Sequence, residues 1–149
     1  MSEIRFITNR SHPTTFREGI LDQVRYQLAA KDWVALDTET THLDPYQAVP
    51  LLLSIDNGST LSFVIDLTSV DISSLYPQLS QKTIIAHNYK YDYKVLKVYT
   101  GQGFRSCWDT MVVEQRIMLG LDYRDGFRYG LDKVLNRRLN VDLPLPKST

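Results

Sequence analysis

Hydrophobic and polar positions follow two periods along the chain, and the changes between them predict the secondary structure. Short apolar runs rich in β-branched and aromatic residues predict strands at 4–8, 33–38, 49–56, 61–67, 83–86 and 105–107. Apolar residues spaced three and four apart predict helices at about 15–30, 71–79, 89–99, 109–119 and 129–136. An Asn-Gly-Ser turn at 57–59 predicts a hairpin between the third and fourth strands.

The order of these elements predicts an α/β protein. The strands first follow one another and then alternate with helices, which favours a mixed β-sheet flanked by helices. A chain of 149 residues is long enough for one domain with a real core, so residues 1–149 are expected to form a single domain. Polar loops are expected at 40–47 and 120–127, and an extended tail at 142–149.

Composition narrows the class of protein. No apolar run approaches the length of a membrane span, although 43% of the residues are hydrophobic. The single cysteine, Cys107, excludes an internal disulfide, and the first five residues lack a secretory apolar core. We therefore expect a cytoplasmic protein without membrane association.

Charge bears on nucleic-acid binding. Lysine plus arginine and aspartate plus glutamate number 17 each, so the net charge is zero. A protein that holds a duplex mainly by charge should be basic. Neutrality argues against a general binding protein more than against an enzyme that takes a few nucleotides of a single-stranded end.

Asp37 and Glu39 are the most informative residues for chemistry. They close the apolar strand 33–38, and side chains two apart on a strand point to the same face. Two carboxylates held together repel each other unless a cation lies between them, and hard divalent ions take such oxygen ligands. The alternative is a pair of solvated surface acids, which an Asp-x-Glu pattern often is.

A second acidic segment follows the predicted strand 83–86. Asp92 lies in the first turn of the predicted helix 89–99, near the positive end of the helix dipole. Asn88 is a candidate cap for that helix or a residue that fixes the preceding loop. Taken alone, Asp92 is either a metal ligand or an acid that offsets the helix dipole.

Together these segments resemble a known enzyme family. Residues 37–45 (DTETTHLDP) and 87–92 (HNYKYD) are similar to the first and second motifs of the DEDD-type 3′–5′ exonucleases. The branch they resemble holds ribonuclease D and the proofreading domains of family A DNA polymerases. Segments 107–111 (CWDTM) and 129–135 (YGLDKVL) agree with it. The resemblance implies a ribonuclease H-like fold.

The resemblance also implies an active site with two Mg²⁺ or Mn²⁺ ions. Asp37 corresponds to the ligand shared by both ions, Glu39 to the ligand on the side of the nucleophile, and Asp92 to the acid acting on the second ion. The family's fourth acid belongs to a later helix, and here the chain ends at Thr149. We therefore expect a fragment lacking its C-terminal helices, or a short relative that is inactive or completed by a second chain.

Four further positions match family residues that contact the substrate or support the metal-binding acid: Thr40, Leu43, Asn88 and Tyr91. Leu43 would wedge against the terminal base, with ordinary core packing as the alternative. For Tyr91 the alternative is a core aromatic residue. Asp109, which precedes Thr110 at a helix start, is expected to cap that helix and not to bind metal.

The sequence thus predicts an exonuclease domain that hydrolyses single-stranded nucleic acid from its 3′ end to nucleoside 5′-monophosphates. DNA is favoured because residues 40–48 resemble the polymerase proofreading type, which also makes an attached polymerase domain a possible partner. One alternative is a ribonuclease D-like RNA-trimming enzyme. Another is a catalytically inactive nucleic-acid-binding or docking module of the same fold.

Overall fold

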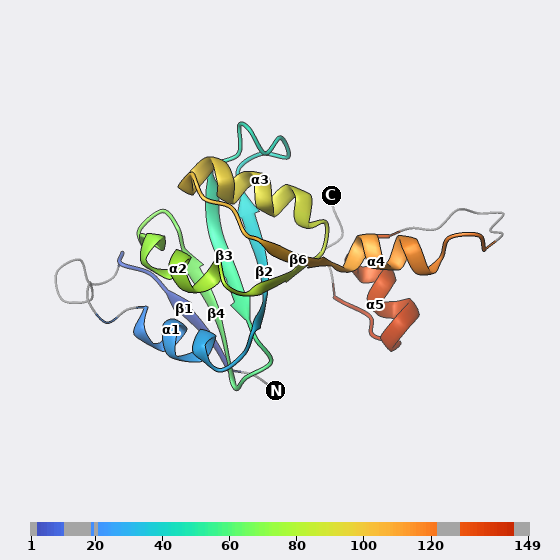
Figure 1. Cartoon of the computed structure of the whole chain (residues 1–149), viewed down its shortest axis with the longest axis horizontal. Helices are drawn as coiled ribbons and strands as arrows, with labels where there is room; N and C mark the ends of the chain where they lie inside the picture. The colour runs from blue at the N-terminus through green and yellow to red at the C-terminus, as the bar shows by residue number, and fades with distance from the viewer. Residues whose placement is uncertain (1–2, 11–18, 20, 122–128, 145–149) are drawn as a thin grey trace.

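The computed structural model describes residues 3–10, 19, 21–121 and 129–144. Six strands form one sheet, with helices beside it (Figure 1). The strands are β1 (Glu3–Ile7), β2 (Trp33–Thr40), β3 (Pro50–Asp56), β4 (Leu61–Asp66), β5 (Thr83–Ala86) and β6 (Ser106–Asp109). The helices are α1 (Asp22–Ala29), α2 (Tyr76–Leu79) after a 3₁₀ turn at Ser73–Leu75, α3 (Tyr89–Thr100), α4 (Thr110–Ile117) and α5 (Leu131–Leu139).

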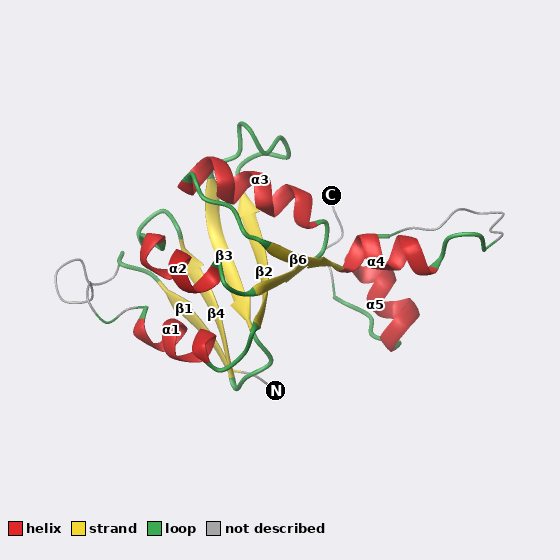
Figure 2. Cartoon of the chain, viewed as in Figure 1, coloured by secondary structure: helices red, strands yellow, loops and turns green. Residues whose placement is uncertain are grey.

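The strands lie in the order β1-β4-β3-β2-β5-β6, drawn in yellow in Figure 2. β2, β3 and β4 pair antiparallel, as neighbouring strands joined by short connections do. β5 and β6 continue the sheet parallel to β2, and each is followed directly by a helix. β1 pairs parallel with β4 at the other edge. The predicted α/β class with a mixed sheet flanked by helices is confirmed.

Boundaries differ from the predictions at a few places. β2 extends two residues further than expected and includes Thr40, with a register irregularity between Glu39 and Thr40. α5 begins at Leu131 because Gly130 is still extended. Residues 15–18 and 20 of the first predicted helix lie outside the described residues, as do 122–128 and 145–149.

The hydrophobic core lies on one face of the sheet. Alternate residues of the central strands point to it, among them Val34 and Leu36 of β2. Helices α1, α2 and α3 pack there through Val24, Leu79 and Leu96, all nearly inaccessible to solvent. Since strand side chains alternate between faces, Asp37 and Glu39 point to the opposite face.

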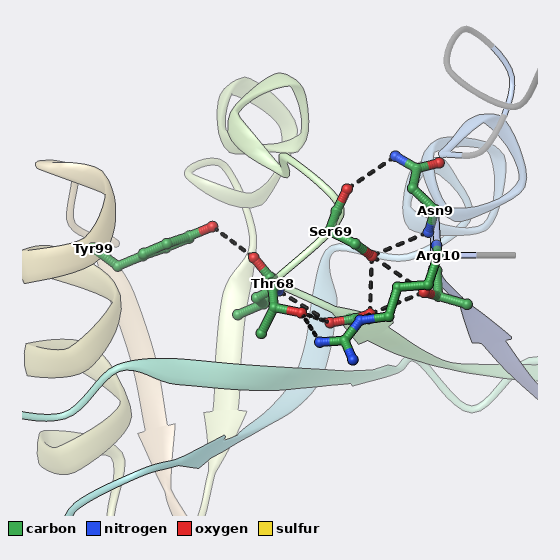
Figure 3. A network of polar contacts seen from close by, with 8 residues as sticks. Asn9, Arg10, Thr68, Ser69 and Tyr99 are labelled. Atoms are coloured by element: carbon green, nitrogen blue, oxygen red, sulfur yellow. Dashed lines mark hydrogen bonds and ion pairs between the residues drawn. The ribbon is translucent and has the colours of Figure 1, made fainter. Parts of the chain in front are cut away.

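A polar network joins the end of β1 to the end of β4 (Figure 3). The buried Asp66 carboxylate accepts hydrogen bonds from the hydroxyls of Thr68, Ser69 and Thr8, and pairs with Arg10 Nε at 3.1 Å. These bonds, the Thr68 hydroxyl first, lower the pKa of Asp66 to about 2. The network fixes β1 at the sheet edge through side chains as well as strand pairing.

α4 and α5 lie beyond the β6 edge of the sheet (Figure 1). The buried Glu114 of α4 accepts from Arg137 Nε and Arg138 Nε of α5, each at 2.8 Å. These arginines lower the pKa of Glu114. None of the helices in the described part of the chain is long and apolar enough to cross a membrane.

Candidate active site

Asp37 and Glu39 lie in the second half of β2, which pairs there with β3 and has already passed its pairing with β5 at Trp33–Ala35. Both side chains reach solvent, while Leu36 and Thr38, which alternate with them, are buried on the core side. Their strand partners on β3 are Ser54 and Leu52, so no opposite charge faces them across the β2–β3 ladder. The sequence prediction that both acids share one face agrees with this geometry.

Asp92 reaches the same strand from helix α3. Its Oδ1 accepts a hydrogen bond from the Thr38 backbone N–H at 3.0 Å and from the Thr38 hydroxyl at 2.6 Å. Asp92 is only 3% exposed. Thr38, the middle residue of the Asp-x-Glu pattern, therefore joins the helix that carries Asp92 to the strand that carries the other two acids.

The electrostatics of these acids is that of a site with excess negative charge. Burial raises the pKa of Asp92 to about 6, and the Asp37 charge adds to the rise, although the hydrogen bonds from Thr38 oppose it. The surrounding protein also desolvates the Asp37 carboxyl and raises its pKa, with a further contribution from Glu39; His87 acts in the opposite direction. The Glu39 charge thus makes ionisation of Asp37 more costly, and the Asp37 charge does the same for Asp92.

The donor chemistry of the site fits a hard divalent cation. Within the described residues no arginine or lysine forms an ion pair with Asp37, Glu39 or Asp92. The same residues contain no group of three or more His, Cys, Asp or Glu side chains gathered closely enough to hold a metal. Asp37 and Glu39 thus share one face of β2, whereas Asp92 binds the buried Thr38 between them, and the three carboxylates are not gathered into one cluster.

Thr40 and Tyr91 contact each other at the end of β2. The Thr40 hydroxyl lies within hydrogen-bond distance of the Tyr91 hydroxyl, and both donate to the backbone carbonyl of His42. Tyr91 lies on α3 directly before Asp92. These two residues therefore fix the start of the loop after β2 against the helix that carries the second acidic motif.

The loop at 41–49 presents Leu43 to solvent. Leu43 is 95% exposed, so core packing, the alternative considered for it, is excluded. The same loop is held to α3 a second time, because Lys94 Nζ lies 4.9 Å from the centre of the Tyr46 ring. The exposed Leu43 side chain thus lies in a loop that is attached to α3 on both sides of it, through His42 and through Tyr46.

Asn88 is the N-cap residue of α3, but its side chain makes no capping hydrogen bond, so of the two predicted roles the side-chain cap is wrong. Its backbone is left-handed, with φ of 63°. Asp109 provides the acceptors instead, for the N–H groups of Asn88 and Tyr89 as well as for its own helix α4. The prediction that Asp109 caps α4 is confirmed, but its second contact was missed, because the adjacency of β5 and β6 is not visible in local sequence.

His87 holds the same turn from its other side. Its Nδ1 lies 2.9 Å from the Thr110 hydroxyl, and its Nε2 lies 2.7 Å from the backbone carbonyl of Tyr129. The turn between β5 and α3 is therefore bound to the starts of both following helical segments.

The mixed six-stranded sheet flanked by helices matches the ribonuclease H-like fold of the DEDD-type exonucleases. A family model described as 3′–5′ exonuclease matches residues 15–148. The chain belongs to this family of hydrolytic 3′–5′ exonucleases. No curated protein sequence matches the chain.

Solved structures agree on the fold. NrnC of Brucella melitensis is 24% identical with a TM-score of 0.72, over 100% of this chain and 66% of that one. Escherichia coli RNase D is 19% identical with a TM-score of 0.73, over 95% of this chain and 34% of that one. The catalytic core of RRP6 from Trypanosoma brucei is 17% identical with a TM-score of 0.72, over 99% and 41%. The chain thus spans about two thirds of NrnC and a smaller share of the others.

Proposed function

We propose that this chain removes nucleotides from the 3′ end of single-stranded nucleic acid, releasing nucleoside 5′-monophosphates with the help of two Mg²⁺ or Mn²⁺ ions. The observation that carries the proposal is the placement of Asp37 and Glu39 on one face of the central strand, with Asp92 bound to Thr38 between them. Family membership supports the reaction class.

Asp37, Glu39 and Asp92 would hold the divalent ions. When bound, such ions supply Lewis acidity and lower the pKa of a water that attacks the phosphodiester. The contribution of the chain is to keep three carboxylates in fixed positions. Thr38 orients Asp92 through two hydrogen bonds, and β2 orients the other two acids. A pKa of about 6 leaves Asp92 mainly ionised at neutral pH and available to a cation.

Four residues would receive the substrate end. Leu43, held out in solvent, would pack on the terminal base, and Thr40 and Tyr91 would fix the loop that carries it. Asn88 would support the helix that presents Asp92. Leu43 has the exposure that a wedge residue needs, because it has no partner to give up before it contacts a base.

The substrate class is the finer part of the proposal. The motif at residues 40–48 favours DNA and a proofreading role beside a polymerase domain. RNA is the second candidate, because solved relatives were determined with pGG and with RNA U12, and E. coli RNase D is described as an exoribonuclease of structured RNA processing. Comparison of matched DNA and RNA substrates separates the two.

The test is nucleotide release from labelled single strands of DNA and RNA, identical in sequence, by this chain with Mn²⁺. Asp37→Ala should abolish release, because it removes the ligand shared by both ions. Asp71→Asn is the matched control, since Asp71 accepts hydrogen bonds from Ser73 near the far end of α3. Release that survives Asp37→Ala would refute the metal assignment.

A nucleic-acid-binding module without turnover is the other candidate function. The observation that favours it is that the described residues hold no metal-binding group of three acidic, histidine or cysteine side chains. Tight binding of a 3′-ended oligonucleotide without nucleotide release, in the presence of Mn²⁺, would establish this module in place of the enzyme.

A further inference from the structure

The start of helix α3 is held by a carboxylate from a different strand. Asp109 Oδ2 accepts from the Tyr89 backbone N–H at 2.9 Å, and its Oδ1 accepts from the Asn88 N–H at 3.1 Å. Neither bond is local, because Asp109 lies at the end of β6. Asp92, the acid of the second motif, is in the first turn of the helix so held.

The same carboxylate begins helix α4. Oδ1 also accepts from the N–H groups of Met111 at 2.9 Å and Val112 at 3.3 Å. Asp109 itself is extended, with φ of −88° and ψ of 109°, as an N-cap residue should be. One side chain thus satisfies the unpaired backbone donors of two helix starts.

Sheet topology explains why the two helix starts meet. β5 and β6 are adjacent and parallel, and Ala86 of β5 is in register with Asp109 of β6. Both strands therefore end at the same edge of the sheet, and each is followed by a helix. The left-handed backbone of Asn88 turns successive N–H groups toward one point, a geometry that makes a concave anion site. Here the anion is the protein's own carboxylate.

We propose that Asp109 is a positioning residue of the exonuclease site. Asp109 fixes the first turn of α3 and thereby holds the Asp92 carboxylate on Thr38. Asp92 Oδ1 accepts there from the Thr38 N–H at 3.0 Å and from the Thr38 hydroxyl at 2.6 Å. Thr38 lies between Asp37 and Glu39, so the hold of Asp109 on α3 sets the position of the helix-borne acid relative to the strand-borne pair. The inference rests on the proposed function only for its effect on turnover.

Asp109→Ser separates the two roles of this side chain. A serine hydroxyl is a good N-cap and can still serve α4, but it offers one oxygen where Asn88, Tyr89, Met111 and Val112 share two. Asp109→Asn is the conservative variant, because its amide keeps one acceptor oxygen. Asp71→Ser is the matched control: Asp71 accepts from Ser73 N–H and hydroxyl near the other end of α3.

The first measurement is amide hydrogen exchange of the native full chain. In Asp109→Ser, exchange at Asn88, Tyr89 and Thr38 should accelerate about tenfold or more, whereas exchange at Met111 should change less than about threefold. Asp109→Asn should be intermediate, and Asp71→Ser should leave Thr38 unchanged. Normal Thr38 exchange in Asp109→Ser, with Asn88 and Tyr89 opened, would overturn the proposal.

The second measurement is single-turnover cleavage of a 3′-labelled oligonucleotide with Mn²⁺, corrected for the folded fraction. The rate at saturating protein should fall about tenfold in Asp109→Ser, while the half-saturating concentration stays within about threefold. Partial recovery in Asp109→Asn is expected. A loss of rate that disappears after this correction, because it reflects only a smaller folded fraction, would mean a purely structural role and would overturn the proposal. Absence of turnover in the unmodified chain would refute the proposed function and leave the exchange result to decide the positioning role.

Discussion

At the scale of single residues, the ionised carboxyl of Asp92 destabilises the fold in the absence of a cation. The carboxyl is buried and is raised in energy further by the Asp37 charge, and its two hydrogen bonds only partly compensate. Its pKa of about 6 lies above the usual 3.8, so the folded protein binds this proton more tightly than the unfolded chain does. Stability must therefore fall as pH rises through that interval.

Asp92→Asn should remove this dependence, because asparagine keeps an acceptor for Thr38 without the charge. With EDTA present, the variant should match the unmodified chain in free energy of unfolding near pH 4. At pH 8 the free energy of unfolding of the variant should exceed that of the unmodified chain by about 2–3 kcal/mol. Urea unfolding at the two pH values checks this. A difference that does not grow with pH would show that the carboxyl is not destabilising.

Leu43 contributes little packing to the free chain because its side chain lies in solvent. It is 95% exposed, so Leu43→Ala should change the free energy of unfolding by no more than about 0.5 kcal/mol. Binding of a 3′-ended oligonucleotide should weaken by about 1 kcal/mol, because a stacking surface is lost. Fluorescence anisotropy measures the affinity. Leu119→Ala, also at an exposed leucine, is the control and should bind normally.

At the scale of elements, the clearest coupling is between α4 and α5. Glu114 is 3% exposed and faces two arginines, so loss of its charge leaves cations beside a buried acceptor. Such pairs contribute little net stability when intact but are costly to break from one side. The pair therefore specifies where α5 lies more than it strengthens the fold.

Glu114→Gln should lower the free energy of unfolding by about 2 kcal/mol and accelerate hydrogen exchange in α5. Glu3→Gln is the matched control. Glu3 pairs with Arg5 at 3.2 Å in an exposed position, and its loss should cost no more than about 0.5 kcal/mol. Thermal unfolding of both variants makes the comparison. Equal effects would contradict the difference in burial.

Local sequence predicted the elements well because their signals are local. Alternation in β2 and the helical spacing of α3 each lie within one segment, and each contains its acidic motif. The acceptor for the first N–H groups of α3 was not predicted, because Asp109 comes from a strand that only the assembled sheet brings close to Asn88. The Thr38–Asp92 contact and the β1–β4 pairing were not predicted for the same reason.

At the scale of the whole molecule, balanced charge limits how nucleic acid can be held. Seventeen basic and seventeen acidic residues give no net attraction for a polyanion. The salt dependence of binding should therefore reflect only a few phosphate contacts. We expect the logarithm of the affinity to fall with the logarithm of salt concentration with a slope of about −2 or shallower.

Anisotropy titrations of a 3′-ended oligonucleotide across salt concentrations measure this slope. Lys94→Met should leave it nearly unchanged, because Lys94 contacts the Tyr46 ring. A slope steeper than about −4 would mean that a basic surface gathers more phosphates than balanced charge allows.

The position of β1 has a consequence for the order of folding. β1 is made first but pairs with β4, from Glu3↔Leu61 to Ile7↔Ile65, so it has no partner strand until β4 is synthesised. The antiparallel strands β2, β3 and β4, by contrast, pair with strands that follow or precede them closely in the chain. At ribosomal speed the partner of β1 emerges roughly 3–12 s later. During that interval Ile4 and Phe6, still 71% and 59% exposed in the finished sheet, are unpaired. Until β4 is complete, the first strand is therefore an open, partly apolar edge that can pair with another molecule.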